Sequence, residues 1–285
     1  MSAPKRRRSV LYLPVVNARA VEKARGLPCD VVVLDLEDAV APEAKAEARA
    51  TAVRVLGEGG FGPREVAVRC NGLDTPWGEA DLKAVAGAGV QTVVLPKIGG
   101  PEDVEQAERI LSGHDRPLRL WVMIETPLAV LRLPAIAAMA NSTRLDGLMI
   151  GTNDLAKDLR CAFTADRAAM SSSLQAVVLA GRAFGLTVLD GTFNDIQDLE
   201  GLAVQCRQGA ELGFDGKTLI HPAQIEAANL AFSPSPEALE RARRIIAAFA
   251  AEPHAGVLKV DGKLTERLHL AEAERIVGLA GANPS

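Results

Sequence analysis

The segment Val31-Val32-Val33-Leu34-Asp35-Leu36-Glu37-Asp38 is a continuous apolar run that ends in acidic residues. Continuous hydrophobicity, rather than alternation of apolar and polar positions, is typical of a strand buried on both faces in a parallel sheet. Further short runs rich in Val, Ile and Leu lie at Val10–Leu13, Val66–Cys70, Thr92–Leu95, Leu118–Ile124, Gly147–Ile150, Thr187–Leu189 and Thr218–Ile220. The sequence therefore predicts eight parallel strands.

Helical patterns separate these runs. They cover Pro42–Leu56, Glu79–Ala88, Pro101–Leu111, Pro127–Ala140, Ser171–Phe184, Asp195–Leu212 and Ala223–Leu230. Eight strands that alternate with helices over about 230 residues predict a (β/α)8 TIM barrel, which we place at residues 1–232. The alternative is a doubly wound open sheet. That fold usually has a glycine-rich turn after its first strand, and Pro14-Val15-Val16-Asn17 contains no glycine.

Residues 233–285 follow the last predicted barrel unit. Ser233-Pro234-Ser235-Pro236-Glu237 predicts the start of a helix that runs over Ala238–Ala251. A hairpin or loop is expected over Gly256–Lys263, and a last helix over Thr265–Leu279. This segment is too small for an independent enzyme domain, so we expect a C-terminal helical extension that acts as a lid or as a subunit contact.

The composition is that of an ordinary globular protein. The chain has 285 residues, a net charge of −4 and 48% hydrophobic residues, which gives no global electrostatic case for nucleic acid or membrane binding. The four cysteines form no C-x-x-C pair, which favours a reducing, cytoplasmic compartment. The longest uncharged stretch, Ala168–Gly181, is too short to span a bilayer.

Polar residues follow the predicted strands at the end where a TIM barrel carries its chemistry. They are Asp35 to Asp38, Arg69 to Asn71, Lys97, Glu125, Thr152 to Asp154, Asp190 and His221. Acidic and basic residues follow six consecutive strands at the same end. Exposure to solvent alone does not readily explain this arrangement. The sequence therefore predicts an active site at this face.

Glu125 and Asp154 follow neighbouring predicted strands, so a barrel would bring them side by side. Two carboxylates, with water and substrate oxygens, are a usual way to hold Mg²⁺. The alternative is that both acids lie at helix N-termini for structural reasons.

The sequence leaves open the roles of two basic residues at this face. Arg69 pairs with Glu37 or Asp38 as a structural ion bridge, or it binds a ligand. Lys97 is either a Schiff-base nucleophile or a residue that balances charge at the rim.

Several segments resemble the citrate lyase β-subunit family of the HpcH/HpaI aldolase superfamily, whose relatives include malyl-CoA and citramalyl-CoA lyases. The matches run in order from Arg8 to about Arg267, and the Gly-Phe-x-Gly-Lys-x-x-Ile-His-Pro stretch is specific. The matching segments are Arg8 to Pro14, Leu34 to Val40, Val68 to Asn71, Leu95 to Lys97, Ile124 to Pro127, Gly151 to Leu155 and Gly213 to Ile225.

This resemblance implies a Mg²⁺-dependent carbon–carbon lyase. Its substrate would be a 3-hydroxyacyl-CoA thioester of the citramalyl-CoA, malyl-CoA or citryl-CoA type, and its products acetyl-CoA or propionyl-CoA and an oxo acid. Glu125 and Asp154 would hold the metal. Arg69 would donate to the thioester enolate oxygen, and Glu37 would orient Arg69.

The resemblance also implies where coenzyme A binds and how the chain assembles. Relatives bind the nucleotide near the first βα loop, which suggests Arg19 and Lys23, together with Arg8. The alternative is that these residues are surface charges. Relatives form trimers or hexamers in which the C-terminal segment closes a neighbour's site, so a homo-oligomer is expected.

One segment departs from the family pattern. Around Val260 to Arg267, relatives usually read Asp-Gly-Lys-Met-Ile-Asp-Arg-Pro from the position of Asp261, so Glu266 stands where they have the acid/base Asp and Leu268 where they have Pro. Glu266 either performs the same proton transfer, or misplaces the carboxyl and changes the reaction, or is a solvated charge on a helix capped by Thr265. Asp38 and Asp190 are the next candidates for the acid/base role.

Three other functions remain open at this point. A thioester hydrolase would use the same Mg²⁺ site and deliver water to the carbonyl. A 4-hydroxy-2-oxo acid aldolase would share the barrel but need no CoA pocket. A non-autonomous β subunit of a citrate lyase complex would act on the thioester of an acyl-carrier protein.

Overall fold

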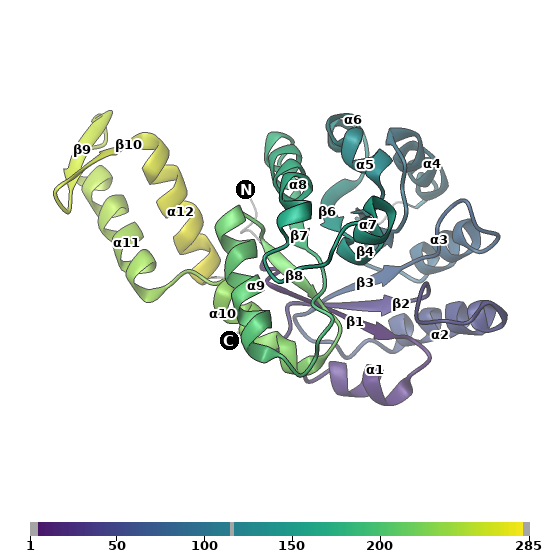
Figure 1. Ribbon diagram of the computed structural model, residues 1–285. Coiled ribbons are helices and arrows are strands. Elements are labelled where there is room, and N and C mark those ends of the chain that lie inside the picture. The colour runs from purple at the N-terminus through teal and green to yellow at the C-terminus, as the bar shows by residue number, and fades with distance from the viewer. Residues whose placement is uncertain (1–4, 115–116, 282–285) are drawn as a thin grey trace. The chain divides into compact units, whose positions relative to one another are not determined.

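Eight parallel strands close into a barrel in the order of the sequence (Figure 1). The structure, a computed structural model, describes residues 5–114 and 117–281. The strands are β1 (Ser9–Pro14), β2 (Val31–Asp35), β3 (Glu65–Arg69), β4 (Thr92–Leu95), β5 (Arg119–Ile124), β6 (Leu145–Ile150), β7 (Thr187–Asp190) and β8 (Gly216–Leu219). The barrel closes because β1 pairs on both sides, with Val10 opposite both Val31 and Thr218. The predicted TIM barrel is confirmed, and the strand limits differ from the predicted ones by at most two residues.

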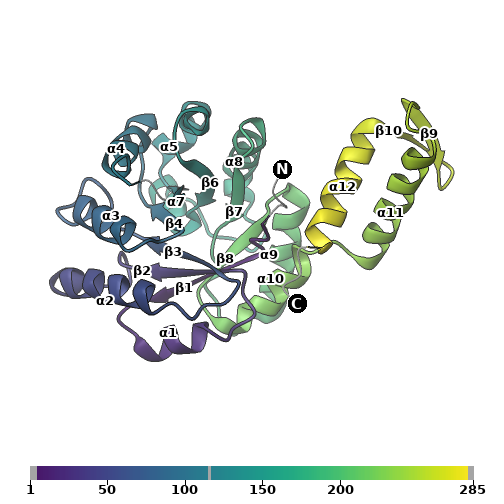
Figure 2. The same cartoon turned by 180° about the vertical axis from the view of Figure 1, so that it is seen from behind.

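Helices surround the barrel and connect its strands (Figures 1 and 2). They are α1 (Ala18–Ala24), α2 (Lys45–Glu58), α3 (Gly78–Gly87), α4 (Pro101–Leu111), α5 (Pro127–Leu131), α6 (Leu133–Ala138), α7 (Thr152–Leu159), α8 (Ser171–Ala183), α9 (Leu199–Leu212) and α10 (Ile225–Ala231). The single helix predicted over Pro127–Ala140 is wrong. Pro134 cannot donate a backbone hydrogen bond, so α5 and α6 are separate helices that meet at Arg132.

Mostly aliphatic side chains fill the barrel interior, together with the buried ring of Trp121. The buried interior residues are Val10, Val31, Val33, Ala67, Val94, Trp121, Met123, Met149 and Leu189, and the half-buried Tyr12 packs against them. Trp121 of β5 fits because its register partner in β6 is Gly147. A Cβ on Gly147 would lie 2.8 Å from the Trp121 ring. The backbone of β6 therefore provides the space for the indole.

An ionic cluster closes the amino end of the barrel. The Arg7 guanidinium lies over the Trp121 ring, 4.7 Å from its centroid. Arg7 also pairs with Glu65 at 3.0 Å and with Asp146 at 2.8 Å. Arg7 and Glu65 are buried, so their charges are compensated within the protein.

Residues 230–281, with Lys5 and Arg6, form a separate compact unit. It contains α11 (Pro236–Ala251), a hairpin of β9 (Val257–Val260) and β10 (Lys263–Glu266), and α12 (Arg267–Gly281). Its buried core comprises Ala242, Ile245, Phe249, Val260 and Ala273. The last helix begins at Arg267, because β10 continues to Glu266, so Thr265 does not cap it and the prediction of Glu266 on its first turn is wrong. The role of this unit as a lid or subunit contact stays a prediction.

Among the described helices, none combines the length and the apolar composition that crossing a membrane requires.

We expect Gly147→Ala to destabilise the barrel by about 1–3 kcal/mol, because the added methyl group overpacks Trp121. Gly57→Ala is the matched control. Gly57 lies in α2 with nothing within 4 Å of an added Cβ, so this substitution should raise stability by up to about 1 kcal/mol. Urea unfolding followed by tryptophan fluorescence measures both changes. Equal stability of the two variants would contradict the packing argument.

Candidate active site

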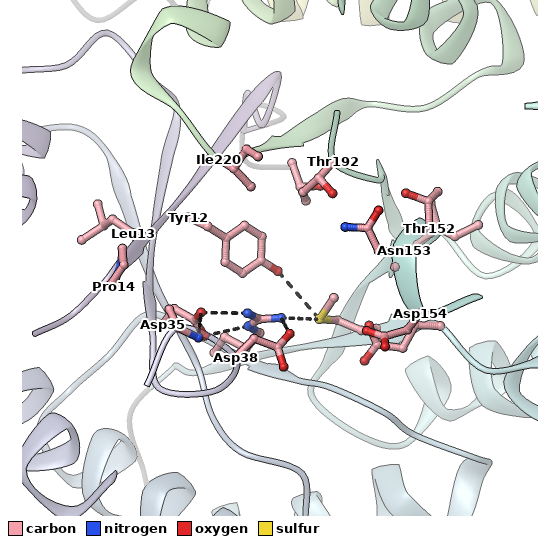
Figure 3. A pocket seen from close by; sticks show the side chains of 17 residues that line it. Tyr12, Leu13, Pro14, Asp35, Asp38, Thr152, Asn153, Asp154, Thr192 and Ile220 are labelled. Atoms are coloured by element: carbon pink, nitrogen blue, oxygen red, sulfur yellow. Dashed lines mark hydrogen bonds and ion pairs between the residues drawn. The ribbon is translucent and has the colours of Figure 1, made fainter. Parts of the chain in front are cut away.

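An open pocket of about 410 Å³ lies at the carboxyl ends of the barrel strands (Figure 3). Its lining comes from the ends of seven strands, all except β4, or from the loops that follow these strands. The lining residues are Tyr12, Leu13, Pro14, Asp35, Asp38, Ala39, Arg69, Met123, Glu125, Ile150, Gly151, Thr152, Asn153, Asp154, Thr192, Thr218 and Ile220. The volume is in the range of small-molecule sites, and several ionisable groups converge on it. This is the face that the sequence predicts for the active site.

Arg69 is held in the pocket wall by a two-pronged bond to Asp35. Its Nε lies 2.7 Å from Asp35 Oδ1 and its Nη2 lies 2.7 Å from Oδ2. The two residues are register partners at the ends of β2 and β3. Burial alone would lower the pKa of Arg69, but the hydrogen bonds and charge of Asp35 outweigh it and hold that pKa well above its usual value. Arg69 is therefore a fixed, permanently charged group.

The predicted partners of Arg69 are also beside it. Arg69 Nη1 lies 2.8 Å from Glu37 Oε2 and 3.3 Å from Asp38 Oδ2. Glu37 is buried, and its Oε2 accepts no hydrogen bond from the described residues despite this short distance. Burial raises the pKa of Glu37, although Arg69 and Lys97 oppose the rise. Glu37 is thus placed to contact Arg69, but Asp35 is the main partner.

The Lys97 side chain contacts two acidic residues of this face. Its Nζ lies 2.5 Å from Glu37 Oε1 and 3.5 Å from Asp38 Oδ1. Burial lowers the pKa of Lys97, but the bond and charge of Glu37 raise it, and the net shift is upward. A Schiff-base nucleophile must lose its proton, so this environment argues against that role and supports charge balance.

Glu125 is a buried carboxylate at the pocket, with a relative exposure of 2%. Its Oε1 accepts a hydrogen bond from the Lys97 backbone N–H at 2.7 Å. Burial raises the pKa of Glu125 to about 7, and the charges of Glu37 and Asp154 add to the rise. A Cβ at Gly151 would lie 2.3 Å from Glu125 Oε2, so this glycine gives the carboxylate its space. A cation beside Glu125 would relieve the cost of its buried charge.

Asp154 lies in the first turn of α7 and lines the same pocket. The side-chain cap of α5 is Thr126, which accepts the N–H of Ala129, and α7 has no side-chain cap. Neither Glu125 nor Asp154 caps a helix with its side chain, although both lie at helix N-termini as the structural alternative expects. In the described part of the chain no three His, Cys, Asp or Glu side chains form a metal cluster. A pair of carboxylates open to water and substrate oxygens still fits Mg²⁺.

Three of the residues predicted in the barrel, Arg8, Arg19 and Lys23, do not line this pocket. Arg19 and Lys23 are exposed on α1, which follows the carboxyl end of β1. Arg8 precedes β1 at the opposite end of the barrel, and its Nη2 lies 2.8 Å from Asp30 Oδ1. Glu266 ends β10 in the separate C-terminal unit. The roles of these four residues in binding or proton transfer stay predictions.

Asp190 is unsuitable as the alternative acid/base residue. It is fully buried and pairs with Arg167 at 2.5 Å and with Lys217 at 2.8 Å. Burial would raise the pKa of Asp190, but the two cations lower it below its usual range. Asp38 is exposed and lines the pocket, so it is the better candidate of the two.

Sequence reasoning missed two residues of the pocket that contact Arg69. Asp35 was expected only as one of several acids after an apolar run, and its position opposite Arg69 in the sheet identifies it as the partner. Tyr12 lies with its ring 4.9 Å from the Arg69 guanidinium, and its hydroxyl contacts the Met123 sulfur at 3.8 Å. Little in the sequence indicates that Tyr12 lines the pocket, because a single aromatic residue in a strand usually packs in the core.

Comparison with known proteins shows the family to which the chain belongs. The chain is 47% identical over 277 residues to a (3S)-malyl-CoA thioesterase of Cereibacter sphaeroides, covering 96% of this chain and 95% of the relative. It is 32% identical to the mitochondrial citramalyl-CoA lyase of Mus musculus, covering 96% and 86%. A solved structure of CitE from Mycobacterium tuberculosis, in complex with magnesium, acetoacetate and coenzyme A, superposes with a TM-score of 0.76. It is 31% identical, and the match covers 96% of this chain and 97% of CitE. The family described as HpcH/HpaI aldolase/citrate lyase matches residues 8–222, so the chain belongs to this family.

Proposed function

We propose that the protein is a Mg²⁺-dependent enzyme that hydrolyses a 3-hydroxyacyl-CoA thioester of the malyl-CoA type. The observation that carries this proposal is the pocket that joins the carboxylates Glu125 and Asp154 to the fixed guanidinium of Arg69. The thioesterase relative at 47% identity supports hydrolysis as the reaction. The CitE complex with magnesium and coenzyme A supports the metal and the thioester carrier.

Glu125 and Asp154 are the residues proposed to hold the metal. A Mg²⁺ ion held there supplies Lewis-acid polarisation of the oxygens of the acyl half. The protein's own contribution is to fix the two carboxylates: Gly151 gives Glu125 space, and Asp154 is set by the first turn of α7.

Arg69 is proposed to stabilise the negative charge that develops on the thioester oxygen. Its bond to Asp35 fixes the orientation of the guanidinium before substrate arrives. A donor that is already oriented stabilises the transition state without reorganisation of the site. In hydrolysis the charge lies on a tetrahedral oxyanion, and in carbon–carbon cleavage it lies on an enolate oxygen.

Asp38 is the proposed base for hydrolysis. It is an exposed carboxylate of the pocket lining, and its Oδ2 lies 3.3 Å from Arg69 Nη1. It would accept a proton from water as the water oxygen bonds to the thioester carbon. The carbon–sulfur bond would then break, the leaving thiolate would take the proton back from Asp38, and the products would be a free hydroxy acid and coenzyme A.

Carbon–carbon cleavage is the second candidate, because the citramalyl-CoA lyase relative is 32% identical over nearly the whole chain. The same metal carboxylates and Arg69 would serve that reaction. Glu266 is then the residue proposed to exchange a proton with the acetyl methyl carbon. Obligate action as a citrate lyase β subunit is the third candidate.

The purified protein with (3S)-malyl-CoA and Mg²⁺ should release free thiol and malate, with no acetyl-CoA or glyoxylate. A thiol reagent detects coenzyme A, and phenylhydrazine detects glyoxylate. Glyoxylate and acetyl-CoA in equal amounts, without free thiol, would instead establish the lyase. Inactivity on malyl-CoA, citramalyl-CoA and citryl-CoA would favour the obligate-subunit function.

Glu125→Gln and Asp154→Asn should each weaken Mg²⁺ binding at least about tenfold and remove most turnover, because each deletes one anionic oxygen donor. Calorimetric titration with Mg²⁺ in the absence of substrate measures the first effect. Glu47→Gln, an exposed position on α2, is the control and should match the unmodified chain. Unchanged Mg²⁺ affinity in both pocket variants, with circular dichroism preserved, would place the metal elsewhere.

Arg69→Lys should lower kcat about 10²- to 10³-fold with a much smaller change in KM. Lysine cannot reproduce the two-pronged bond to Asp35, and the lost interaction strengthens in the transition state. Arg54→Lys, at an exposed position on α2, should leave both constants unchanged. An effect confined to KM would reassign Arg69 to binding of the ground-state substrate.

A further inference from the structure

Lys97 has an unusual backbone at the edge of the proposed site. It follows β4 with a φ of +53°, in the left-handed region that residues with a side chain rarely adopt. In this conformation its N–H donates to Glu125 Oε1 at 2.7 Å. The backbone of Lys97 thereby orients the buried carboxylate and leaves Oε2, on the Gly151 side, for a ligand.

The side chain of the same residue reaches the other half of the site. Its ammonium lies 2.5 Å from Glu37 Oε1 and 3.5 Å from Asp38 Oδ1. Glu37 Oε2 lies 2.8 Å from Arg69 Nη1. Lys97 therefore touches the proposed metal ligand with its backbone and the partner of Arg69 with its side chain.

The buried Glu37 side chain depends on this contact. Its backbone is already fixed, because Lys45 Nζ donates to the carbonyl of Glu37 at 2.7 Å. The carboxylate accepts a hydrogen bond from Lys97 through Oε1, whereas within the described structure Oε2 accepts none and has only its ion pair with Arg69. Removal of the Lys97 ammonium would leave the buried carboxylate with this ion pair alone, which favours its displacement.

We propose that Lys97 is a positioning residue that couples the two halves of the site, the carboxylates that hold the metal and the guanidinium that stabilises the oxyanion. This inference rests on the proposed function. It assigns Lys97 no contact with the reacting atoms. Its N–H fixes Glu125, and its ammonium fixes Glu37 beside Arg69.

Four substitutions separate the ammonium from the backbone. Lys97→Met and Lys97→Gly remove the ammonium but keep the N–H, and Gly adopts the left-handed conformation without strain. Lys97→Val removes the ammonium and disfavours that conformation, because valine is branched at Cβ. Lys97→Arg keeps a cation that can reach Glu37.

We expect Lys97→Met and Lys97→Gly to lower kcat about 10- to 100-fold, as is usual for residues that orient metal ligands and their neighbours. Their KM and their Mg²⁺ dissociation constant, measured calorimetrically without substrate, should stay within about threefold of the unmodified chain. Lys97→Val should in addition weaken Mg²⁺ binding about tenfold. Lys97→Arg should recover most of the kcat that Lys97→Met loses, which a merely structural role of the methylene chain would not produce.

Unchanged kcat in Lys97→Met would overturn the role of the ammonium. Equal Mg²⁺ affinity in Lys97→Gly and Lys97→Val would overturn the role of the backbone. If Lys97→Val does not fold, Lys97→Ala takes its place and should bind Mg²⁺ more weakly than Lys97→Gly. An unmodified chain that binds no Mg²⁺ would overturn the proposed function together with this inference, whereas the variant comparisons test Lys97 alone.

Discussion

Crowding of negative charge at the carboxyl ends of the strands is the constraint on which the site depends. Among the described residues, closure of the barrel brings five carboxylates to this face, against three nearby cations, Arg69, Lys97 and Lys45. The carboxylates are Asp35, Glu37, Asp38, Glu125 and Asp154. Burial makes this excess costly, as the raised pKa values of Glu37 and Glu125 show. A bound cation would relieve this cost. The excess of carboxylates that makes the barrel face costly is therefore also the feature that would hold the proposed metal.

The barrel could be predicted from the sequence because its signal is repeated. Each strand is a short run buried on both faces, and an error of one or two residues at a strand end leaves the count and order unchanged. Features that occur once were harder to predict. Pro134 divides one expected helix into α5 and α6, and the hairpin strand β10 extends through Thr265 to Glu266. In both places a local feature, a proline in one and pairing with β9 in the other, sets the boundary.

The sequence predicts most residues of the candidate site, but only some of the contacts between them. Glu125, Asp154, Arg69 and Glu37 were identified because they follow apolar runs at one end of the barrel. The main partner of Arg69 was not, because three acids, Asp35, Glu37 and Asp38, lie at the end of β2 and the order of residues does not reveal which of them is opposite Arg69 in the sheet. The N–H of Lys97 was also missed, because residue type does not reveal the direction of a backbone donor.

The ionic cluster around Arg7 covers the amino end of the barrel. Within the described residues, side chains fill the interior and Arg7 covers Trp121 at the amino end, so the pocket opens at the carboxyl ends of the strands. A ligand that reaches Glu125 through this opening also has to leave through it. If hydrolysis leaves two products in the pocket, the one that lies nearer the opening has to leave first.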